Sequence, residues 1–295
     1  MTDIVFHLNG KIVPESQAVV PVTDRGFLYG DGLFETLHAY GAHPFRLNEH
    51  LERMQRGFEA LQLTEAPSLK TLTQYVKESI EHAKFPETNI RITVTRGSGA
   101  RGPSSSGKFS PTVVVMATKF VRRPEKDYTE GVAAVLASFR RQEMSVAAGL
   151  KTTNYLEQIL AKREADAAGV DEALLLNQSG LLCEGSASNV TLVKNGTLCV
   201  PDPKLVGALP GTGQLVAMEL ARKLKIPVHQ GLLGPFDLKD CEEAFLSGSM
   251  REITPLIRVG NDKIGNGKPG PITTKLIAAY RELVMQECPG YRFSK

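Results

Sequence analysis

Strand-like and helix-like patterns alternate along the whole chain, and this alternation restricts the possible folds more than any other feature of the sequence. Residues 33–40 and 90–95 alternate apolar and polar side chains, as half-buried strands do. Between them, residues 49–63 repeat apolar side chains every three or four positions, which indicates an amphipathic helix that Asn48 can cap. The sequence therefore predicts a mixed α/β or α+β fold.

Two Asn-Gly pairs indicate hairpins far apart in the chain. Asn9-Gly10 lies at the centre of residues 4–13, where it favours a type I′ turn, and Asn195-Gly196 lies at the centre of residues 190–200. Residues 24–32 contain three glycines and are expected to form a turn-rich loop. Further strands are expected at residues 19–22, 112–117, 132–138, 172–177, 226–229 and 243–246, and further helices at residues 69–83, 153–168, 214–224 and 271–286.

The regular pattern breaks near residue 121, and 295 residues are enough for two ordinary domains. We therefore predict a small N-terminal α/β domain over residues 1–121, a linker over residues 122–126 and a larger C-terminal domain over residues 127–295. Strand and helix patterns occur in both parts, so neither domain is expected to be purely helical.

Composition excludes several classes of function. Hydrophobic residues make up 42% of the chain and charged residues 23%, so a packed core is expected. The net charge of +3 is spread over interspersed charges, without the basic stripe of a nucleic-acid-binding protein. The four cysteines lack the spacing of a zinc site or a disulfide framework, and no metal site is expected. Without a signal-peptide pattern or a membrane-spanning run at the N-terminus or elsewhere, a cytoplasmic protein is expected.

Lys151 has a setting that suits covalent chemistry. Residues 147–150 and 152–154 on either side are uncharged and mostly small, so they could bury the lysine. A free lysine, with a pKa of ~10.4, is a poor nucleophile at neutral pH. Burial lowers that pKa and allows the amine to form an imine. A lone lysine at a helix start is more often a surface residue, so Lys151 needs support from other parts of the chain.

Glu184 provides part of that support. It is followed by the small residues 185–189, which would let a flat ligand approach the backbone. A carboxylate can pair with a pyridinium nitrogen, and a lysine amine can hold an aldehyde cofactor as a Schiff base. Lys151 and Glu184 together therefore suggest pyridoxal 5'-phosphate (PLP) as a cofactor.

PLP also needs donors for its phosphate group. Residues 209–213 precede a predicted helix, whose N-terminal N–H groups could bind an anion. Residues 247–250 form a second turn of small and hydroxyl-bearing side chains, and Arg53 could supply a matching charge. Neither a Walker motif nor a GxGxxG motif that links a strand to a helix is present, so nucleotide binding has no comparable support.

Six blocks in this order resemble the class IV, or fold-type IV, PLP-dependent enzymes. That family includes branched-chain amino-acid aminotransferases, D-amino-acid aminotransferases and aminodeoxychorismate lyases. The blocks are YGDGLFE at 29–35, FRLNEHLER at 45–53, KTTNYL at 151–156, EGSASN at 184–189, LPGT at 209–212 and REITPL at 251–256. The resemblance implies a two-domain fold like that of D-amino-acid aminotransferase, with PLP between a small and a larger domain, and a homodimer.

The resemblance also implies a role for each matching residue. Lys151 would be the Schiff-base lysine and proton shuttle, and Glu184 would pair with the pyridine nitrogen. The other implied cofactor contacts are Arg53 at the phosphate, Tyr155 near the ring oxygen, the backbone of Thr212 and Gly213, and Ser249. The residues implied on the substrate side are Tyr29, Phe34, Thr36, His38, Arg101 and Met250.

Three stretches depart from the patterns of the subgroups. The G-I-T-R run common in the family is replaced by Gly-Thr-Gly-Gln at residues 211–214, so the hydroxyl moves by one place and the cation is lost. His38 replaces the arginine of the F-E-G-I-R run typical of branched-chain aminotransferases. Arg101 is kept from the R-x-H pattern of the D-amino-acid enzymes, but the histidine is not. Residues 96–102, like Thr36, resemble some aminodeoxychorismate lyases instead.

The resulting prediction is an aminotransferase that moves an amino group between an amino acid or amine and a 2-oxo acid. The alternative on the same scaffold is a 4-amino-4-deoxychorismate lyase that releases pyruvate and 4-aminobenzoate. A third alternative is a binding protein that has lost catalysis, but the presence of Lys151 and Glu184 argues against it. The identity of the substrate and the preference for L- or D-amino acids stay open at this point.

Overall fold

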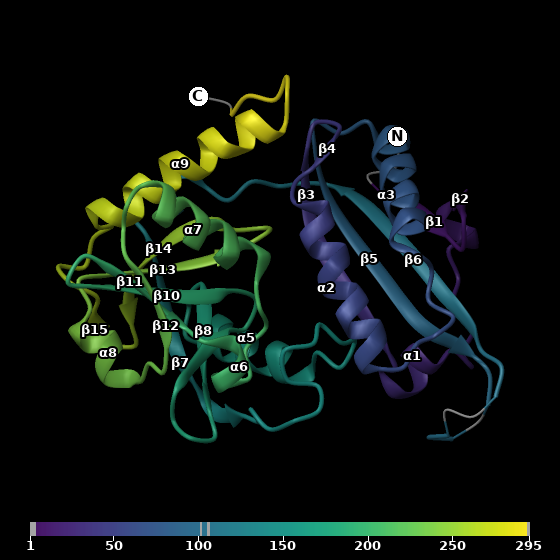
Figure 1. The fold of residues 1–295 in the computed structure, drawn as a ribbon, viewed down its shortest axis with the longest axis horizontal. Coiled ribbons are helices and arrows are strands. Elements are labelled where there is room, and N and C mark those ends of the chain that lie inside the picture. The colour runs from purple at the N-terminus through teal and green to yellow at the C-terminus, as the bar shows by residue number, and fades with distance from the viewer. Residues whose placement is uncertain (1–3, 101, 105–106, 294–295) are drawn as a thin grey trace. The chain divides into compact units, whose positions relative to one another are not determined.

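The structure, a computed structural model, describes residues 4–100, 102–104 and 107–293. The chain divides into two compact units (Figure 1). Unit 1 consists of Met1–Val121, Leu150–Asn154 and Val284–Lys295, and unit 2 consists of Arg122–Gly149 and Tyr155–Leu283. The architecture is mixed α+β, as predicted from the alternation of strand and helix patterns.

Unit 1 is built on a six-stranded sheet with the order β2-β1-β6-β5-β3-β4, in which all neighbouring strands are antiparallel. Its strands are β1 (Ile4–Leu8), β2 (Lys11–Val13), β3 (Gly32–Tyr40), β4 (His43–Pro44), β5 (Glu87–Ser98) and β6 (Ser110–Lys119). Its helices are η1 (Glu15–Gln17), α1 (Arg25–Tyr29), α2 (Leu47–Ala60) and α3 (Leu69–Ala83).

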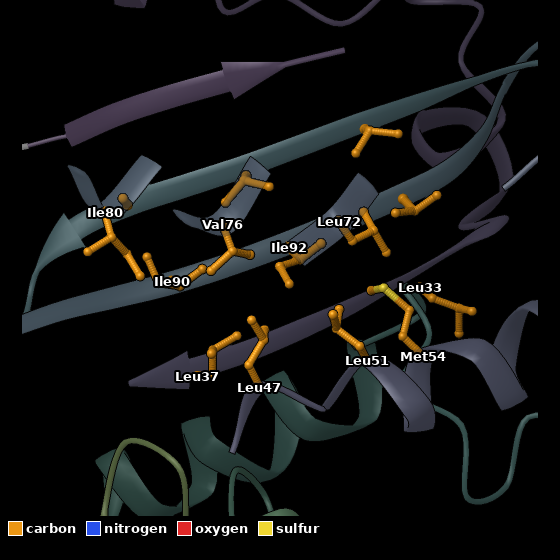
Figure 2. Packing of buried hydrophobic residues seen from close by; sticks show 14 of the residues in the cluster. Leu33, Leu37, Leu47, Leu51, Met54, Leu72, Val76, Ile80, Ile90 and Ile92 are labelled. Carbon is orange, nitrogen blue, oxygen red and sulfur yellow. The ribbon is translucent and has the colours of Figure 1, made fainter. Parts of the chain in front are cut away.

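The core of unit 1 lies between one face of the sheet and the two long helices α2 and α3. Period-two alternation places Leu33 and Leu37 of β3 on this face, and Ile90 and Ile92 of β5 lie beside them. The apolar stripes of α2 and α3 cover these residues (Figure 2). The opposite face of β3 is therefore left for other side chains.

Unit 2 contains a nine-stranded mixed sheet with the order β12-β11-β10-β13-β14-β7-β8-β9, and β15 pairs with β14. Its strands are β7 (Val132–Arg141), β8 (Glu172–Asn177), β9 (Leu182–Gly185), β10 (Asn189–Lys194), β11 (Thr197–Pro201), β12 (Val228–Gly231), β13 (Glu243–Gly248), β14 (Glu252–Val259) and β15 (Asp262–Lys263). Its helices are α4 (Glu125–Thr129), α5 (Leu156–Ala167), α6 (Pro203–Val206), α7 (Thr212–Lys223), α8 (Pro235–Asp240) and α9 (Pro271–Glu287), the last of which ends in unit 1.

The two units differ from the contiguous domains predicted at residues 1–121 and 127–295. Residues 150–154 belong to unit 1 because they hydrogen-bond along the edge of β3. The last residues of the chain also belong to unit 1, where the Tyr291 hydroxyl donates to Glu87 at 3.0 Å. The predicted linker at residues 122–126 already enters helix α4 and forms no separate connection. Contacts between distant parts of the chain decide this division, so a break in local pattern cannot reveal it.

Several predicted elements are corrected by the structure. Helix α2 begins at Leu47, two residues earlier than predicted, and Arg46 rather than Asn48 occupies its N-cap position. The predicted loop at residues 24–32 contains the short helix α1, which Asp24 caps by accepting a hydrogen bond from the Gly26 N–H at 2.7 Å. Residues 19–22 form no strand, and strand β14 was not predicted. Both Asn-Gly hairpins and helix α3 are confirmed.

Candidate active site

Lys151 is anchored in unit 1 by main-chain hydrogen bonds to β3. The Phe34 N–H donates to the Lys151 carbonyl, and the Thr153 N–H donates to the Gly32 carbonyl, both at 2.9 Å. The Thr153 hydroxyl adds a bond of 2.7 Å to the carbonyl of Gly30. Residues 150–154 thus continue the sheet next to the start of β3, and the backbone of the lysine has a fixed position.

The Lys151 amine lies on the sheet face opposite the helices of unit 1. Its Nζ is 4.6 Å from the centre of the Phe34 ring. Alternation along β3 places Phe34 and Thr36 on that same face. Arg91 of β5 pairs with Thr36, and its guanidinium carbon is 3.8 Å from the centre of the Phe34 ring. Two cationic groups therefore approach one aromatic ring.

Arg91 was not among the residues singled out from the sequence. The signal was available, because residues 90–95 alternate and Arg91 falls on the face that carries no apolar side chains. What the sequence alone does not contain is the register that places Arg91 opposite Thr36.

His38 departs from its predicted place on the substrate side. Its side chain is 1% exposed, and its Nε2 lies 2.9 Å from a carboxylate oxygen of Glu87. The rings of Tyr40 and Phe120 pack against it, with centroids at 3.8 Å and 3.9 Å. The imidazole is therefore a packed residue of unit 1, with almost no surface that a substrate could touch.

The remaining predicted substrate residues lie in different environments. Thr36 is half-buried in β3, and Met250 is half-buried in the turn after β13. Tyr29 is exposed at the end of α1, and its hydroxyl accepts a hydrogen bond of 3.1 Å from the Gly102 N–H. Arg101 lies outside the described residues.

A buried cluster of three charged or polar side chains surrounds Arg53 in unit 1. Arg53 donates from Nε to one carboxylate oxygen of Glu35 at 2.7 Å and from Nη2 to the other at 2.6 Å. His50 Nδ1 lies 2.7 Å from the second of these oxygens. Glu35 is on the core face of β3, on the same side as Leu33 and Leu37.

The charges in this cluster are balanced. Burial alone would raise the pKa of Glu35, but the charge and hydrogen bonds of Arg53, with the hydrogen bond of His50, lower that pKa to about 2. Burial is the main cause that lowers the pKa of His50 and so favours the neutral imidazole. Glu35 and His50 were missed from the sequence, although an acidic residue on the apolar face of a strand is a signal that could have found the first.

Glu184 is held in unit 2 by two donors. It lies in β9, opposite Leu175 of β8. One of its carboxylate oxygens accepts a hydrogen bond from the Leu209 N–H at 2.9 Å, and the other forms an ion pair with Arg141 at the end of β7. All the polar atoms involved come from buried or partly buried residues, so the orientation of the carboxylate is well defined. Arg141 was not predicted as a functional residue.

The small residues after Glu184 are organised by a second buried carboxylate, Glu172. It accepts hydrogen bonds from the Ser186 N–H at 3.0 Å, from the Ser186 hydroxyl, and from the Ser188 hydroxyl at 2.7 Å. A Cβ on Gly185 would lie 2.4 Å from the Ser188 hydroxyl, so only glycine fits there. The small residues predicted to admit a flat ligand form a tightly bonded turn.

The N-terminus of α7 carries the predicted phosphate donors. The Thr212 hydroxyl lies 3.2 Å from the Ser249 hydroxyl, and Gly211 occupies the N-cap position without a capping side chain. A Cβ on Gly213 would lie 2.8 Å from the Gly248 nitrogen. The first N–H groups of a helix have no partner within the helix and favour anions. The turn before α7 is held by Asn189, whose amide donates to the Leu209 carbonyl at 2.9 Å.

The last predicted cofactor residue and the cysteines need only brief description. Tyr155 is half-buried at the N-cap position of α5. The four cysteines are buried free thiols. Among the described residues, no group of three or more His, Cys, Asp or Glu side chains could hold a metal ion. Within the same described part of the chain, every helix is too short or too polar to cross a membrane.

Comparison with known proteins identifies the family. Residues 32–259 match the family model of the class IV aminotransferases. A putative branched-chain-amino-acid aminotransferase of Methanocaldococcus jannaschii is 35% identical over 281 residues, which cover 94% of this chain and 96% of the relative. A D-alanine aminotransferase of Listeria innocua is 29% identical over 290 residues, which cover 98% and 99%. The chain belongs to the class IV aminotransferase family.

Solved structures agree with this assignment. A branched-chain amino acid aminotransferase from T.th. with pyridoxamine 5'-phosphate superposes with a TM-score of 0.88 at 27% identity, over 97% of this chain and 96% of that one. A 4-amino-4-deoxychorismate lyase from Pseudomonas aeruginosa superposes with a TM-score of 0.83 at 30% identity, over 94% and 98%. The fold is that of the fold-type IV enzymes, and these neighbours include both reaction types that the sequence suggested.

Proposed function

We propose that this protein is a PLP-dependent aminotransferase that moves an amino group between an amino acid or amine and a 2-oxo acid. The observation that carries the proposal is the anchored position of Lys151, whose backbone is bonded to β3 and whose amine lies over Phe34. Membership of the family and the names of its relatives support amino-group transfer. The pyridoxamine 5'-phosphate in the structure of the T.th. aminotransferase supports the choice of cofactor.

The residues of unit 2 fit a pyridine ring that carries a phosphate. Glu184 offers an oriented carboxylate for a ring nitrogen, and the start of α7 offers N–H groups together with the hydroxyls of Thr212 and Ser249. Leu209 is bonded to Glu184 and is three residues from Thr212, a separation that an extended chain spans in at most about 10 Å. The close approach of Gly213 to Gly248 brings the turn that carries Ser249 to the same helix end.

Each of these residues has a chemical role in the proposal. PLP, when bound, supplies an electron sink that stabilises a carbanion at the carbon bearing the amino group. Glu184 keeps the ring nitrogen protonated, and the Arg141 ion pair and the Leu209 N–H hold the carboxylate in position. Tyr155 binds the ring oxygen.

Lys151 has two tasks in the proposal. Its amine binds the aldehyde carbon of the cofactor covalently and, once released by an amino donor, moves a proton from the substrate carbon to the cofactor. The bonds from β3 hold its backbone still, so the amine can act repeatedly from one place. The aromatic face of Phe34 next to Nζ keeps water from part of its surroundings.

The phosphate and substrate contacts complete the assignment. Arg53 would bind the phosphate through a guanidinium that Glu35 orients. Tyr29, Phe34, Thr36, Met250 and Arg101 remain the proposed substrate residues. His38 is left out because it is buried against Tyr40 and Phe120.

We also propose a cytoplasmic homodimer. Large apolar side chains are exposed on α1 at Phe27, Leu28 and Tyr29, where an association surface would cover them. Four buried free thiols fit a reducing compartment.

A lyase that converts 4-amino-4-deoxychorismate to pyruvate and 4-aminobenzoate is the second candidate. It is favoured by the likeness to the Pseudomonas aeruginosa lyase, which has 30% identity to this chain. The two functions share the cofactor and Lys151 and differ in whether the substrate carbon is reprotonated on the cofactor side or loses a leaving group.

A half-reaction screen separates the two candidates. The PLP-loaded protein is mixed with L- and D-amino acids, primary amines and 4-amino-4-deoxychorismate, one at a time. For an aminotransferase we expect at least one amino donor to remove the visible band of the lysine-bound cofactor and leave pyridoxamine 5'-phosphate. If no donor does so while 4-amino-4-deoxychorismate yields 4-aminobenzoate, the lyase is correct. A Lys151→Ala variant that keeps the visible band would overturn both.

A further inference from the structure

The ion pair between Glu35 and Arg53 has a geometry that fixes the arginine more firmly than a single contact would. Two nitrogens of the guanidinium donate to two different oxygens of the same carboxylate, at 2.7 Å and 2.6 Å. Such a pair defines the plane of the guanidinium as well as its distance. His50 adds a contact of 2.7 Å to one of these oxygens, so the carboxylate cannot rotate without losing it.

The pair also connects two different elements of unit 1. Glu35 belongs to β3, while His50 and Arg53 are three residues apart on α2 and so lie on the same face of that helix. The neighbours on these faces are apolar, among them Leu33, Leu51 and Met54. Arg53 is 7% exposed and could not keep its charged group in this environment without an anionic partner.

We infer that Glu35 is a positioning residue for the cofactor: it sets the direction in which Arg53 presents its guanidinium to the phosphate of PLP. This inference rests on the proposed function, which assigns Arg53 to the phosphate. Glu35 lies on the core face of β3, whereas Phe34 and Thr36 lie on the opposite face. Glu35 therefore acts through Arg53 and does not touch the reacting atoms.

The competing explanation is that Glu35 only stabilises unit 1, as many buried ion pairs do. A structural role would weaken every ligand of the protein alike, because a loosened unit binds nothing well. A positioning role would weaken only ligands that carry the phosphate. Pyridoxal has the ring and aldehyde of PLP without the phosphate, so a comparison of the two ligands distinguishes these roles.

The experiment measures the equilibrium dissociation constants of PLP and of pyridoxal for the cofactor-free protein, from the absorbance of the lysine-bound form. Glu35→Gln is expected to weaken PLP roughly 10- to 100-fold, the range for the loss of a hydrogen bond to a charged group, and to leave pyridoxal within about twofold. Because Glu35→Gln leaves the Arg53 charge without its buried anion and could prevent folding, Glu35→Asp is the second variant. It keeps the charge and shifts the guanidinium, and the same selective loss is expected.

Two further variants complete the design. Asp31→Asn is the matched control, because Asp31 also joins two arginines of unit 1, Arg25 at 2.9 Å and Arg96 at 2.8 Å, without touching Arg53. It is expected to leave the ratio of the two dissociation constants unchanged. Arg53→Lys tests the premise and is expected to weaken PLP selectively.

The outcomes separate the inference from the proposed function. If Arg53→Lys weakens PLP selectively and both Glu35 variants do not, or if the Glu35 variants weaken both ligands equally, the positioning role is wrong and the function stands. If Arg53→Lys itself shows no selective loss, the assignment of Arg53 to the phosphate is wrong, and the inference falls with it.

Discussion

At the scale of single residues, this protein places charged groups in apolar surroundings and gives each a specific partner. Glu35 is held by Arg53 and His50, and Glu184 is held by Arg141 and the Leu209 N–H. A buried charge costs free energy unless it is paired, so each pair restricts where its members can lie. In both cases the result is an oriented group that can meet a ligand in one geometry.

The depressed pKa of Glu35 predicts an acid-dependent loss of stability. Its pKa is lowered from 4.5 to about 2 in the folded protein, because the Arg53 charge outweighs the effect of burial. Since the folded value is below the unfolded one, the stabilisation is complete above about pH 4.5 and is lost as the pH falls towards about 2. This carboxylate should contribute about 3 kcal/mol above that window.

Denaturant unfolding of the wild type and of Glu35→Gln between pH 7 and pH 2 measures this contribution. The two free energies of unfolding should differ at neutral pH and converge as the pH falls through the window, because carboxylates that do not touch Glu35 cancel in the comparison. A difference that stays constant down to pH 2 would contradict the prediction.

Glu184 leads to a prediction about catalysis. In Glu184→Gln the side chain keeps its shape but loses the charge that favours a protonated ring nitrogen, so kcat for the best donor of the screen should fall roughly 10²- to 10⁴-fold. Cofactor content, read from the visible absorbance, should remain near that of the wild type. Glu143→Gln is the control, since Glu143 is a surface carboxylate bonded to Ser179. An unchanged kcat in Glu184→Gln would remove Glu184 from the mechanism.

At the scale of elements, local signals and long-range pairing contribute differently to the site. The Asn-Gly hairpins and helix α3 were predictable, because their turns and the Ser68 cap are encoded in a few adjacent residues. Lys151 and Glu184 were recognisable from short motifs. The pairing of residues 150–154 with β3 and the Arg141 ion pair with Glu184 were not, because each joins segments that are far apart in the chain. A sequence pattern without an alignment contains no information about such pairings.

The close approach between α7 and the turn after β13 predicts the effect of adding one methyl group. Alanine usually stabilises a helix relative to glycine by about 1 kcal/mol. In Gly213→Ala, however, the new Cβ would lie 2.8 Å from the Gly248 nitrogen and 2.9 Å from its Cα. The backbone would have to move apart, so we expect a destabilisation of about 1–3 kcal/mol and weaker PLP binding.

Gly234→Ala is the control for this substitution. Gly234 also lies at a helix start, has a negative φ of −128°, and a Cβ there would have no neighbour within 4 Å. Thermal unfolding and PLP titration of both variants are the measurements. If Gly213→Ala is as stable as Gly234→Ala and binds PLP as tightly as the wild type, the contact between α7 and the turn is looser than the structure indicates.

At the scale of the whole molecule, the exposed apolar side chains are unevenly distributed. Among the described residues, six large apolar side chains with high exposure fall within one short stretch of unit 1, at Val19, Val20, Val22, Phe27, Leu28 and Tyr29. Scattered exposed apolar residues are normal, but a cluster of this kind usually marks an association surface. The same stretch contains Tyr29, a proposed substrate residue, so association and substrate binding are expected to depend on each other.

Phe27→Glu tests this surface, because Phe27 is 74% exposed and its replacement should not disturb the core. A charge at the centre of a dimer interface would have to lose its hydration, so the variant should be monomeric at micromolar concentration and should have a higher KM or a lower kcat than the dimeric wild type. Phe236→Glu makes the same chemical change on α8 at a residue that is 85% exposed, and it should stay dimeric and active. Light scattering after size-exclusion chromatography measures the mass. A dimeric Phe27→Glu protein with normal kinetics would show that α1 lies outside the interface, and the link between association and substrate binding through Tyr29 would then be lost.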